Sequence, residues 1–227
     1  MTKSRKFAAI IFITIVLSFY NFLSYAQLVE QEQGYFLQKP RLFYAGLVCG
    51  INFTQVDGDN FAGYYKTGAN FGGIGYINLP KNLAISWEFL YSQKGSKSNI
   101  VRQAGIDSIY ITNYGIKVNY AEIPVMINLF DKFKSHFGIG VSYNRLVSYS
   151  EVLATYPRYN IDLNKYPFKT DEWEFLAAAN LHVWKGLFFN IRFQYSLVPM
   201  RTQIPPEFSR ALQYNNLWTV RLMYLFM

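Results

Sequence analysis

The chain alternates between apolar and polar residues over much of its length, and the clearest example is the segment 217–227, LWTVRLMYLFM. Successive side chains of a β-strand point to opposite faces, so this alternation predicts a strand. One face would carry Trp218, Val220, Leu222, Tyr224 and Phe226, and the other Thr219, Arg221 and Met223. A strand with faces this different needs an apolar environment on one side only.

Seven further segments bring the expected number of strands to eight. Five show the same alternation: 41–53, 83–92, 135–145, 171–183 and 187–197. Residues 67–78 are rich in glycine, and we assign a strand there from its spacing to the neighbouring strands. Residues 114–128 change phase near Tyr120, where we expect a β-bulge. Pro124 lies close by and has no N–H for a ladder, so it points to the same irregularity.

The connections between these strands are alternately long and short. The short ones are 79–82, 129–134 and 184–186, and the long ones are 54–66, 94–113, 148–170 and 198–215. An even number of strands with short turns at one end and long loops at the other is typical of outer-membrane barrels. We therefore predict an all-β fold: an eight-stranded, antiparallel, transmembrane up-and-down β-barrel with periplasmic turns and outer loops.

Two other architectures can be compared with this prediction. A soluble barrel of the lipocalin kind would point its apolar side chains inward. The Trp, Phe, Tyr and Leu side chains of these segments are too bulky for that, because eight strands leave an interior just wide enough for side chains. A bundle of membrane helices is excluded, since no second run of about 18 apolar residues follows the first 27 residues.

The first residues read as an export signal. Lys3, Arg5 and Lys6 precede an apolar run over 7–23, and the small residues of Ser24-Tyr25-Ala26 follow it. This is the pattern of a secretory signal peptide, with cleavage expected after Ala26; an uncleaved membrane anchor is the alternative. We expect residues 1–26 to be the signal peptide, 27–40 a periplasmic N-terminal tail and 41–227 the barrel domain, located in the bacterial outer membrane.

Composition excludes several other classes of protein. The 227 residues are 51% hydrophobic, 19% aromatic and 16% charged, which is too apolar for a disordered chain. A single cysteine cannot form an internal disulfide. Removing the three basic residues of 1–26 lowers the net charge from +8 to +5. This excess is mild and forms no stripe, so nucleic acid is not an expected partner.

Four charged residues fall on the inward parity of their strands at similar distances from the short turns: Glu88, Glu122, Arg192 and Arg221. The strands with the glutamates should lie across the interior from the strands with the arginines. Isolated charges are costly in such a place, so we expect the four side chains to pair as a cluster. The cluster would be a salt-bridged plug or, alternatively, a gate that opens when the pairs exchange.

The two histidines, His136 and His182, fall on the inward parity near the short-turn mouth. Two imidazoles are the beginning of a metal site, but no Cys, Asp or Glu at their level completes it. We favour two solvated histidines and expect no cofactor. They are also the only imidazole bases for catalysis, and no serine or acid is placed beside them on the lipid face. We expect a non-enzymatic protein; a lipid-modifying barrel enzyme and a narrow channel stay open as alternatives.

Aromatic residues have two expected locations. Those near the strand ends would form a belt at the level of the lipid headgroups. The long loop 148–170 carries four tyrosines, which could instead offer a face for a sugar or a peptide: Tyr149, Tyr156, Tyr159 and Tyr166.

Several stretches carry a resemblance to a known family. They are ISWEFLYSQKGS at 85–96, NYAEIPVMINL at 119–129 with Glu122-Ile123-Pro124 as its most specific part, and GIGVSYNRLVS at 138–148. Over residues 41–227 the chain resembles the PorT-like outer-membrane β-barrel family of Gram-negative bacteria. The resemblance implies an outer-membrane barrel in contact with lipid and lipopolysaccharide, inserted by the barrel-assembly machinery. Through the family's namesake it also implies an accessory role in type IX protein secretion, with subunits of that machinery as partners.

Overall fold

The computed structural model describes residues 42–59, 61, 63–98, 101–104, 109–158, 162–201 and 209–226. The predicted signal peptide and N-terminal tail, like Tyr159, lie outside the described residues. The elements are β1 (Phe43–Asp59), β2 (Lys66–Leu79), β3 (Leu83–Lys97), β4 (Arg102–Gln103), β5 (Tyr110–Phe130), β6 (His136–Tyr156), the 3-10 helix η1 (Leu163–Lys165), β7 (Asp171–Trp184), β8 (Leu187–Ser196) and β9 (Ser209–Phe226). Within these ranges, no helix has the length and hydropathy needed to span a membrane.

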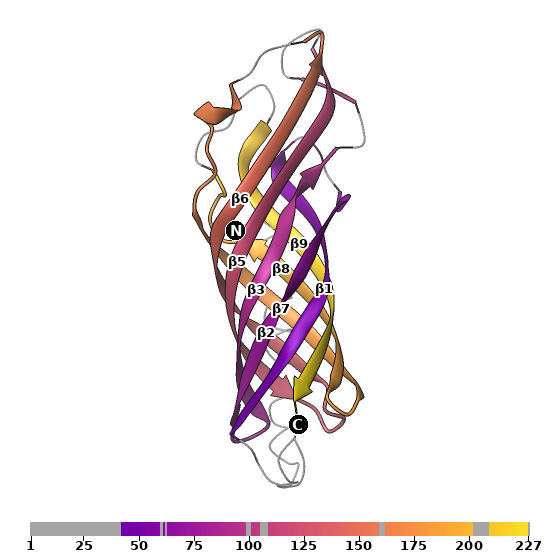
Figure 1. Cartoon of the computed structure of the whole chain (residues 1–227), viewed down its shortest axis with the longest axis vertical. Helices are drawn as coiled ribbons and strands as arrows, with labels where there is room; N and C mark the ends of the chain where they lie inside the picture. Colours follow the sequence, from indigo (N-terminus) through magenta and orange to yellow (C-terminus); the bar gives the residue numbers. More distant parts are fainter. Residues whose placement is uncertain are drawn as a thin grey trace, which may run out of the picture. The chain divides into compact units, whose positions relative to one another are not determined.

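Eight of the strands form one closed antiparallel ring (Figure 1). Neighbours pair in the order β3, β2, β1, β9, β8, β7, β6 and β5, and β5 pairs with β3 to close the ring. The two-residue strand β4 pairs only with the start of β5. The predicted eight-stranded up-and-down barrel is therefore confirmed. Closure leaves the ring without a free edge, as a bilayer requires of a sheet.

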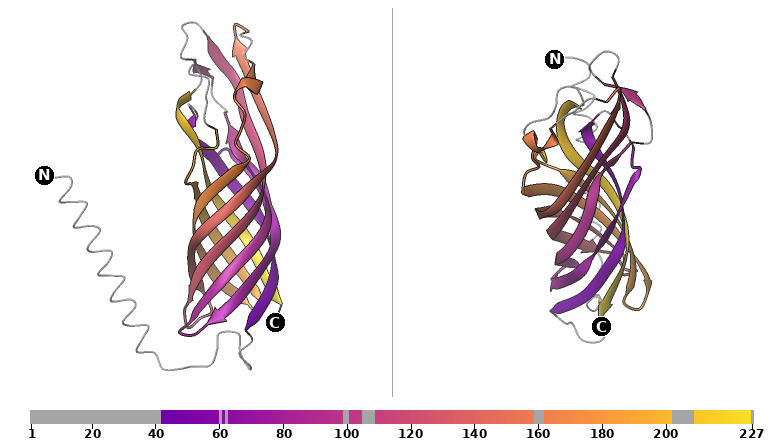
Figure 2. Two further views of the ribbon diagram at one scale, coloured as in Figure 1. Left: turned by 90° about the vertical axis from the view of Figure 1, so that its left-hand side faces the viewer. Right: turned by 45° about the horizontal axis from the view of Figure 1, so that its top comes forward.

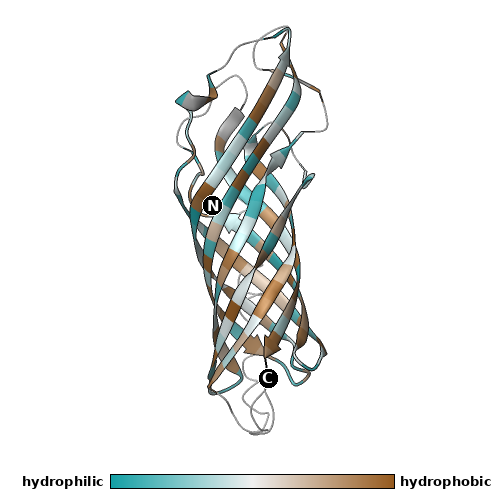
Figure 3. Cartoon of the chain, viewed as in Figure 1, coloured by the Kyte–Doolittle hydropathy of each residue, from teal (hydrophilic) through white to brown (hydrophobic). Residues whose placement is uncertain are grey.

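The two faces of the ring differ as the alternation predicted. On β9 Thr219 and Arg221 are buried in the interior, whereas Leu222 is exposed on the outside. Large apolar side chains are exposed around the ring, among them Leu47, Phe89, Val141, Phe175 and Ile191. In Figure 3 hydrophobic residues (brown) recur along the strands in the half of the barrel that ends in short turns. An apolar surface this extensive is expected where a protein meets lipid or another protein.

Strands β5 and β6 are 21 residues long each and continue past the loop ends of the other strands (Figure 2). The expected bulge lies between them, but in the other strand. Asn119 pairs with Ser148 and Tyr120 with Leu146, so the extra residue is Val147 of β6. The prediction of a bulge in β5 near Tyr120 was wrong, because β5 keeps its even-numbered residues inward from Tyr114 to Phe130. Its apparent change of phase arises because those inward residues become apolar toward the loop end. A separate shift in register lies at Thr112, near the loop end of β5.

Pro124 interrupts the ladder between β3 and β5, as its missing N–H predicts. Trp87 pairs with Val125 and Leu90 with Glu122, whereas Glu88 and Phe89 have no ladder partner on β5. On its other side Pro124 pairs with Ser142 of β6. The barrel therefore stays closed across the proline, with a local gap in the hydrogen bonds.

A hydrophobic core fills the loop end of the barrel. It contains Val56, Phe61, Ala104, Ile109, Ile111, Tyr114, Ile116, Val118, Tyr120, Phe168 and Met200. Five of these residues come from the extended part of β5, Val56 comes from β1, and the others lie in the long connections that fold over the barrel end. At the loop end the described connections are therefore packed against the strands. The sequence had predicted loops over 94–113 and 148–170, but β3 continues to Lys97, β5 begins at Tyr110 and β6 continues to Tyr156.

We predict that a charge is tolerated poorly on the outward face at mid-height of the barrel. Val141→Arg should lower the free energy of unfolding by about 2–4 kcal/mol, because the guanidinium would lie in hydrocarbon. Phe133→Arg, in the exposed turn between β5 and β6, is the control and should cost less than about 1 kcal/mol. Denaturant titration in lipid vesicles measures both, and equal costs would contradict a lipid-facing surface.

Candidate functional site

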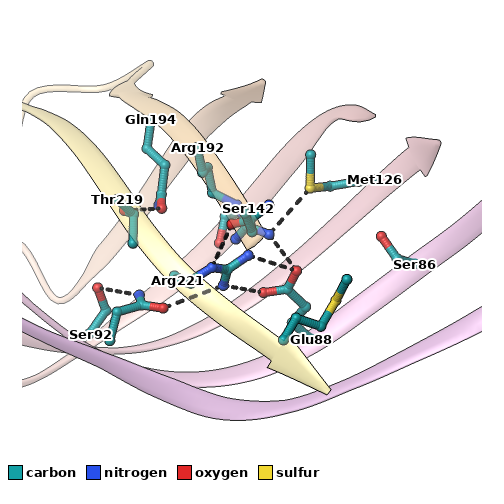
Figure 4. Close-up of polar contacts among 12 residues, drawn as sticks. Ser86, Glu88, Ser92, Met126, Ser142, Arg192, Gln194, Thr219 and Arg221 are labelled. Carbon is teal, nitrogen blue, oxygen red and sulfur yellow. Dashed lines mark hydrogen bonds and ion pairs between the residues drawn. The ribbon is translucent and has the colours of Figure 1, made fainter. Parts of the chain in front are cut away.

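Charged side chains from across the ring meet in the interior of the barrel, and Glu88 of β3 is at the centre of the first group (Figure 4). Its carboxylate pairs with Arg192 of β8 and, at 2.8 Å, with Nη1 of Arg221 of β9. The three side chains are almost completely buried. A carboxylate that bridges two guanidiniums satisfies charges that would be costly alone in a water-poor interior.

Neutral side chains orient the two arginines. Arg221 donates from Nε to Oδ1 of Asn190 at 2.8 Å and from Nη1 to Oδ1 of Asn70 at 3.3 Å. Arg192 lies 3.5 Å from the sulfur of Met126 through its Nη2. These contacts reach β2, β5 and β8, so this group connects strands on several sides of the ring. We call Glu88, Arg192 and Arg221 the glutamate–arginine cluster.

A second group surrounds Lys94 of β3. Its Nζ lies 2.5 Å from Glu122 of β5, and 2.7 and 3.7 Å from Glu174 and Glu172 of β7. Glu174 also accepts a hydrogen bond from Gln194 at 2.9 Å. We call Lys94 and its three glutamates the lysine–glutamate cluster, and all four side chains are fully or almost fully buried.

The two clusters complement each other in charge. The glutamate–arginine cluster has two cations for one anion, and the lysine–glutamate cluster has three carboxylates for one cation. They are adjacent, because Gln194, which binds Glu174, stands two residues from Arg192 on β8. Opposite excess charges held close together at low dielectric attract each other, so the interior is one connected polar network.

The sequence predicted part of this arrangement. The structure brings Glu88, Arg192 and Arg221 together but places Glu122 against Lys94 instead, so the predicted membership of Glu122 was wrong. Lys94, Glu172 and Glu174 were missed, although all three share the inward parity of Glu88 in their strands. The expectation considered only charges at one depth, whereas a lysine side chain is long enough to reach a carboxylate several residues away along the barrel.

The structure places the two histidines in different surroundings. His136 is buried, contacts Phe130 and Phe188, and has its Nε2 3.0 Å from the hydroxyl of Tyr76. The expectation that it would be solvated was therefore wrong. His182 lies at the turn, with Nε2 2.7 Å from the carbonyl oxygen of Lys185. No group of three metal-binding side chains occurs among the residues that the structure describes.

The described tyrosines of the predicted loop face do not share one surface. Tyr149 and Tyr156 belong to β6 rather than to a loop. The ring of Tyr149 packs edge-on against Phe168, and Tyr156 pairs with Tyr110 on the outward side of the strands. The backbone oxygen of Tyr166 accepts a hydrogen bond from Arg201. A sugar or peptide face made from these residues stays a prediction.

Comparison of the sequence with known families agrees with this geometry. The family described as "Outer membrane protein beta-barrel domain" matches residues 25–201. The chain belongs to this family. Its location is therefore the outer membrane. The finer PorT-like resemblance is not decided by this match.

Solved structures that resemble this chain have low sequence identity with it. Ail, the attachment invasion locus protein of Yersinia pestis, is 9% identical with a TM-score of 0.44, and in complex with the heparin analogue sucrose octasulfate it is 10% identical with a TM-score of 0.42. Both alignments cover 82% of this chain and 100% of Ail. The outer membrane protein AlkL in DMPC bilayers is 11% identical over 86% of this chain and 97% of its own, with a TM-score of 0.36. No curated protein sequence matches the chain.

We predict that the glutamate–arginine cluster is essential for stability. Glu88→Gln keeps the shape of the side chain but leaves two buried guanidiniums without a counter-charge, and should lower the free energy of unfolding by about 3–5 kcal/mol. Asp171→Asn is the matched control, because Asp171 pairs with Arg145 at 2.7 Å on the exposed surface. It should cost much less, because water screens an exposed pair. Denaturant titration of both folded variants distinguishes them, and similar costs would contradict the account.

Proposed function

We propose that this outer-membrane barrel is a non-enzymatic structural and interaction protein that works through its extracellular end and does not conduct solutes. The observation that carries the proposal is the filled interior. Two ion clusters with almost fully buried side chains occupy the middle of an eight-stranded ring. Eight strands leave room for side chains only, so these groups take the space that a channel would need.

The extracellular end offers a rigid surface for an interaction. Arg201 pairs with Glu151 of β6 at 2.7 Å and lies 4.0 Å over the ring of Phe168. These contacts hold the long connections against the part of β5 and β6 that projects past the other strands, which we call the β5–β6 ribbon. Near the tip of this ribbon Tyr110 and Tyr156 pair across the strands, and Tyr156 is 73% exposed. Exposed aromatic residues on a rigid support are favourable sites for binding a partner.

Two further observations support the non-enzymatic part of the proposal. A hydrolase needs a nucleophile beside a base that an acid orients. The ring Nε2 atoms of His136 and His182 instead contact a tyrosine hydroxyl and a backbone carbonyl.

For the specific role we propose an accessory of type IX protein secretion. This proposal rests on the resemblance of residues 85–96, 119–129 and 138–148 to the PorT-like family.

We predict no channel activity. The protein reconstituted in planar bilayers should give no discrete conductance steps, and Glu88→Gln should stay closed as well, because glutamine fills the same volume. Heat-modifiable migration in gels checks that each sample is folded. Stable conductance steps in the unchanged protein would indicate a narrow channel. Steps that occur only in Glu88→Gln would indicate a gate controlled by the glutamate–arginine cluster.

We predict that the tagged protein, mildly cross-linked in native outer membranes, co-purifies with subunits of the secretion machinery in stoichiometric amounts. Replacing Tyr110 and Tyr156 with serine should reduce this recovery strongly, because the exposed pair at the ribbon tip would be lost. Phe133→Ser, in an exposed turn at the periplasmic end, is the control and should leave recovery unchanged. Mass spectrometry measures all three. Recovery of the barrel alone at high yield would contradict the secretion role.

A further inference from the structure

An aspartate and two tyrosines meet on the outward face of the ring, near the loop ends of β1, β9 and β8. Asp57 of β1 stands directly opposite Tyr214 of β9, so the two side chains leave the sheet side by side. The ring of Tyr214 is nearly parallel to the ring of Tyr195 of β8, with an interplanar angle of 11° and ring centroids 6.3 Å apart. The two rings therefore turn their negatively polarised faces in the same direction, next to a carboxylate.

Asn216 of β9 connects a third tyrosine to this group. Its Nδ2 donates to Oδ2 of Asp57 at 3.0 Å, and its Oδ1 accepts a hydrogen bond from the hydroxyl of Tyr64 at 2.9 Å. Gln55 donates to Oδ1 of Asp57 at 2.8 Å and accepts a hydrogen bond from the backbone N–H of Gly63 at 3.0 Å. The connection between β1 and β2, which carries Tyr64, is in this way held next to the carboxylate.

These contacts orient the carboxylate of Asp57 but do not neutralise it. The groups that Gln55 and Asn216 offer are neutral amides, and no ion pair among the residues that the structure describes includes Asp57. Asp57, Tyr195 and Tyr214 are each half-buried, so water screens this charge incompletely. A cation at this place would be attracted by the carboxylate and by the ring faces together.

A comparable group between β6 and β7 contains its own cation. Asp171 accepts a hydrogen bond from the hydroxyl of Tyr143 at 2.6 Å, and the ring of Tyr143 packs against Trp173 with centroids 5.4 Å apart. Arg145 donates to the same carboxylate oxygen at 2.7 Å. Here the chain itself places a guanidinium on a carboxylate beside aromatic rings, and the described part of the chain places none on Asp57.

We propose that Asp57, with Tyr64, Tyr195 and Tyr214, forms a binding site for an organic ligand that carries an alkylated ammonium group. Aromatic faces attract such a group, and the carboxylate supplies its counter-charge. A calcium or magnesium ion fits less well, because it requires about six or more oxygen ligands. In the ring, β9 is the fourth strand from β5 in both directions, so the site lies across the barrel from the β5–β6 ribbon and is independent of the interaction proposed there.

Choline is the probe, and isothermal titration calorimetry of the folded protein in detergent micelles measures its binding. The comparison probe is the uncharged isostere of choline, in which a carbon atom replaces the ammonium nitrogen. Choline should bind at least about tenfold more tightly than this isostere. Asp57→Asn keeps the shape of the side chain without its charge and should bind both probes equally weakly. Tyr214→Leu should weaken choline binding about two- to fivefold, because one ring face is lost.

Asp171→Asn is the matched control. It removes the same charge from a carboxylate beside aromatic rings, but Arg145 already occupies that carboxylate, so the affinity for choline should not change. Phosphocholine identifies the source of the ammonium group, since equal affinity supports a lipid headgroup and weaker affinity supports a free cation. Heat-modifiable migration verifies folding, and Tyr214→Leu replaces Asp57→Asn if that variant does not fold.

Three results would overturn the proposal. The first is equal binding of choline and its isostere by the unchanged protein. The second is a preference for choline that persists in Asp57→Asn, or that Asp171→Asn reduces equally. The third is complete displacement of choline by sodium chloride at the same concentration, which would indicate a nonspecific attraction of cations.

Discussion

Within a bilayer every backbone N–H and C=O group must find its partner inside the protein, and the pairing of β3 with β5 is the contact that meets this demand here. It joins the two ends of an otherwise open sheet. Once the ring is closed, alternate residues of each strand face the lipid or the interior, and this parity changes only where a bulge such as the one at Val147 adds a residue. The ring has eight strands, so its interior is narrow, and every inward side chain must pack against side chains from the opposite wall.

This narrow interior contains two different environments. At mid-barrel it is polar, and the glutamate–arginine and lysine–glutamate clusters join β3 and β5 to β7, β8 and β9. Toward the outside it is apolar, and residues such as Ile116 and Tyr120 pack with the long connections. The first environment holds the walls of the ring in register, because breaking any pair would leave a buried charge. The second supports the β5–β6 ribbon beyond the membrane.

Period-two alternation was enough to predict the strands and the inward placement of Glu88, Arg192 and Arg221, because parity within a strand decides which face a side chain occupies. It could not predict the partner of Glu122, which depends on how far Lys94 reaches along the interior. Nor could it assign the bulge to Val147, since one extra residue in β6 is visible only in the pairing with β5. The burial of His136 depends on Tyr76, Phe130 and Phe188, which come from three other strands.

The single cysteine, Cys49, allows the central claim to be measured without changing the sequence. It lies in β1, is exposed on the outward face, and pairs with Phe71 and Leu222 in the neighbouring strands. A nitroxide attached to Cys49 in lipid vesicles should collide frequently with dissolved oxygen and rarely with a water-soluble nickel chelate. Frequent collisions with the nickel chelate instead would place this face in water and contradict a barrel whose apolar side is turned to the membrane.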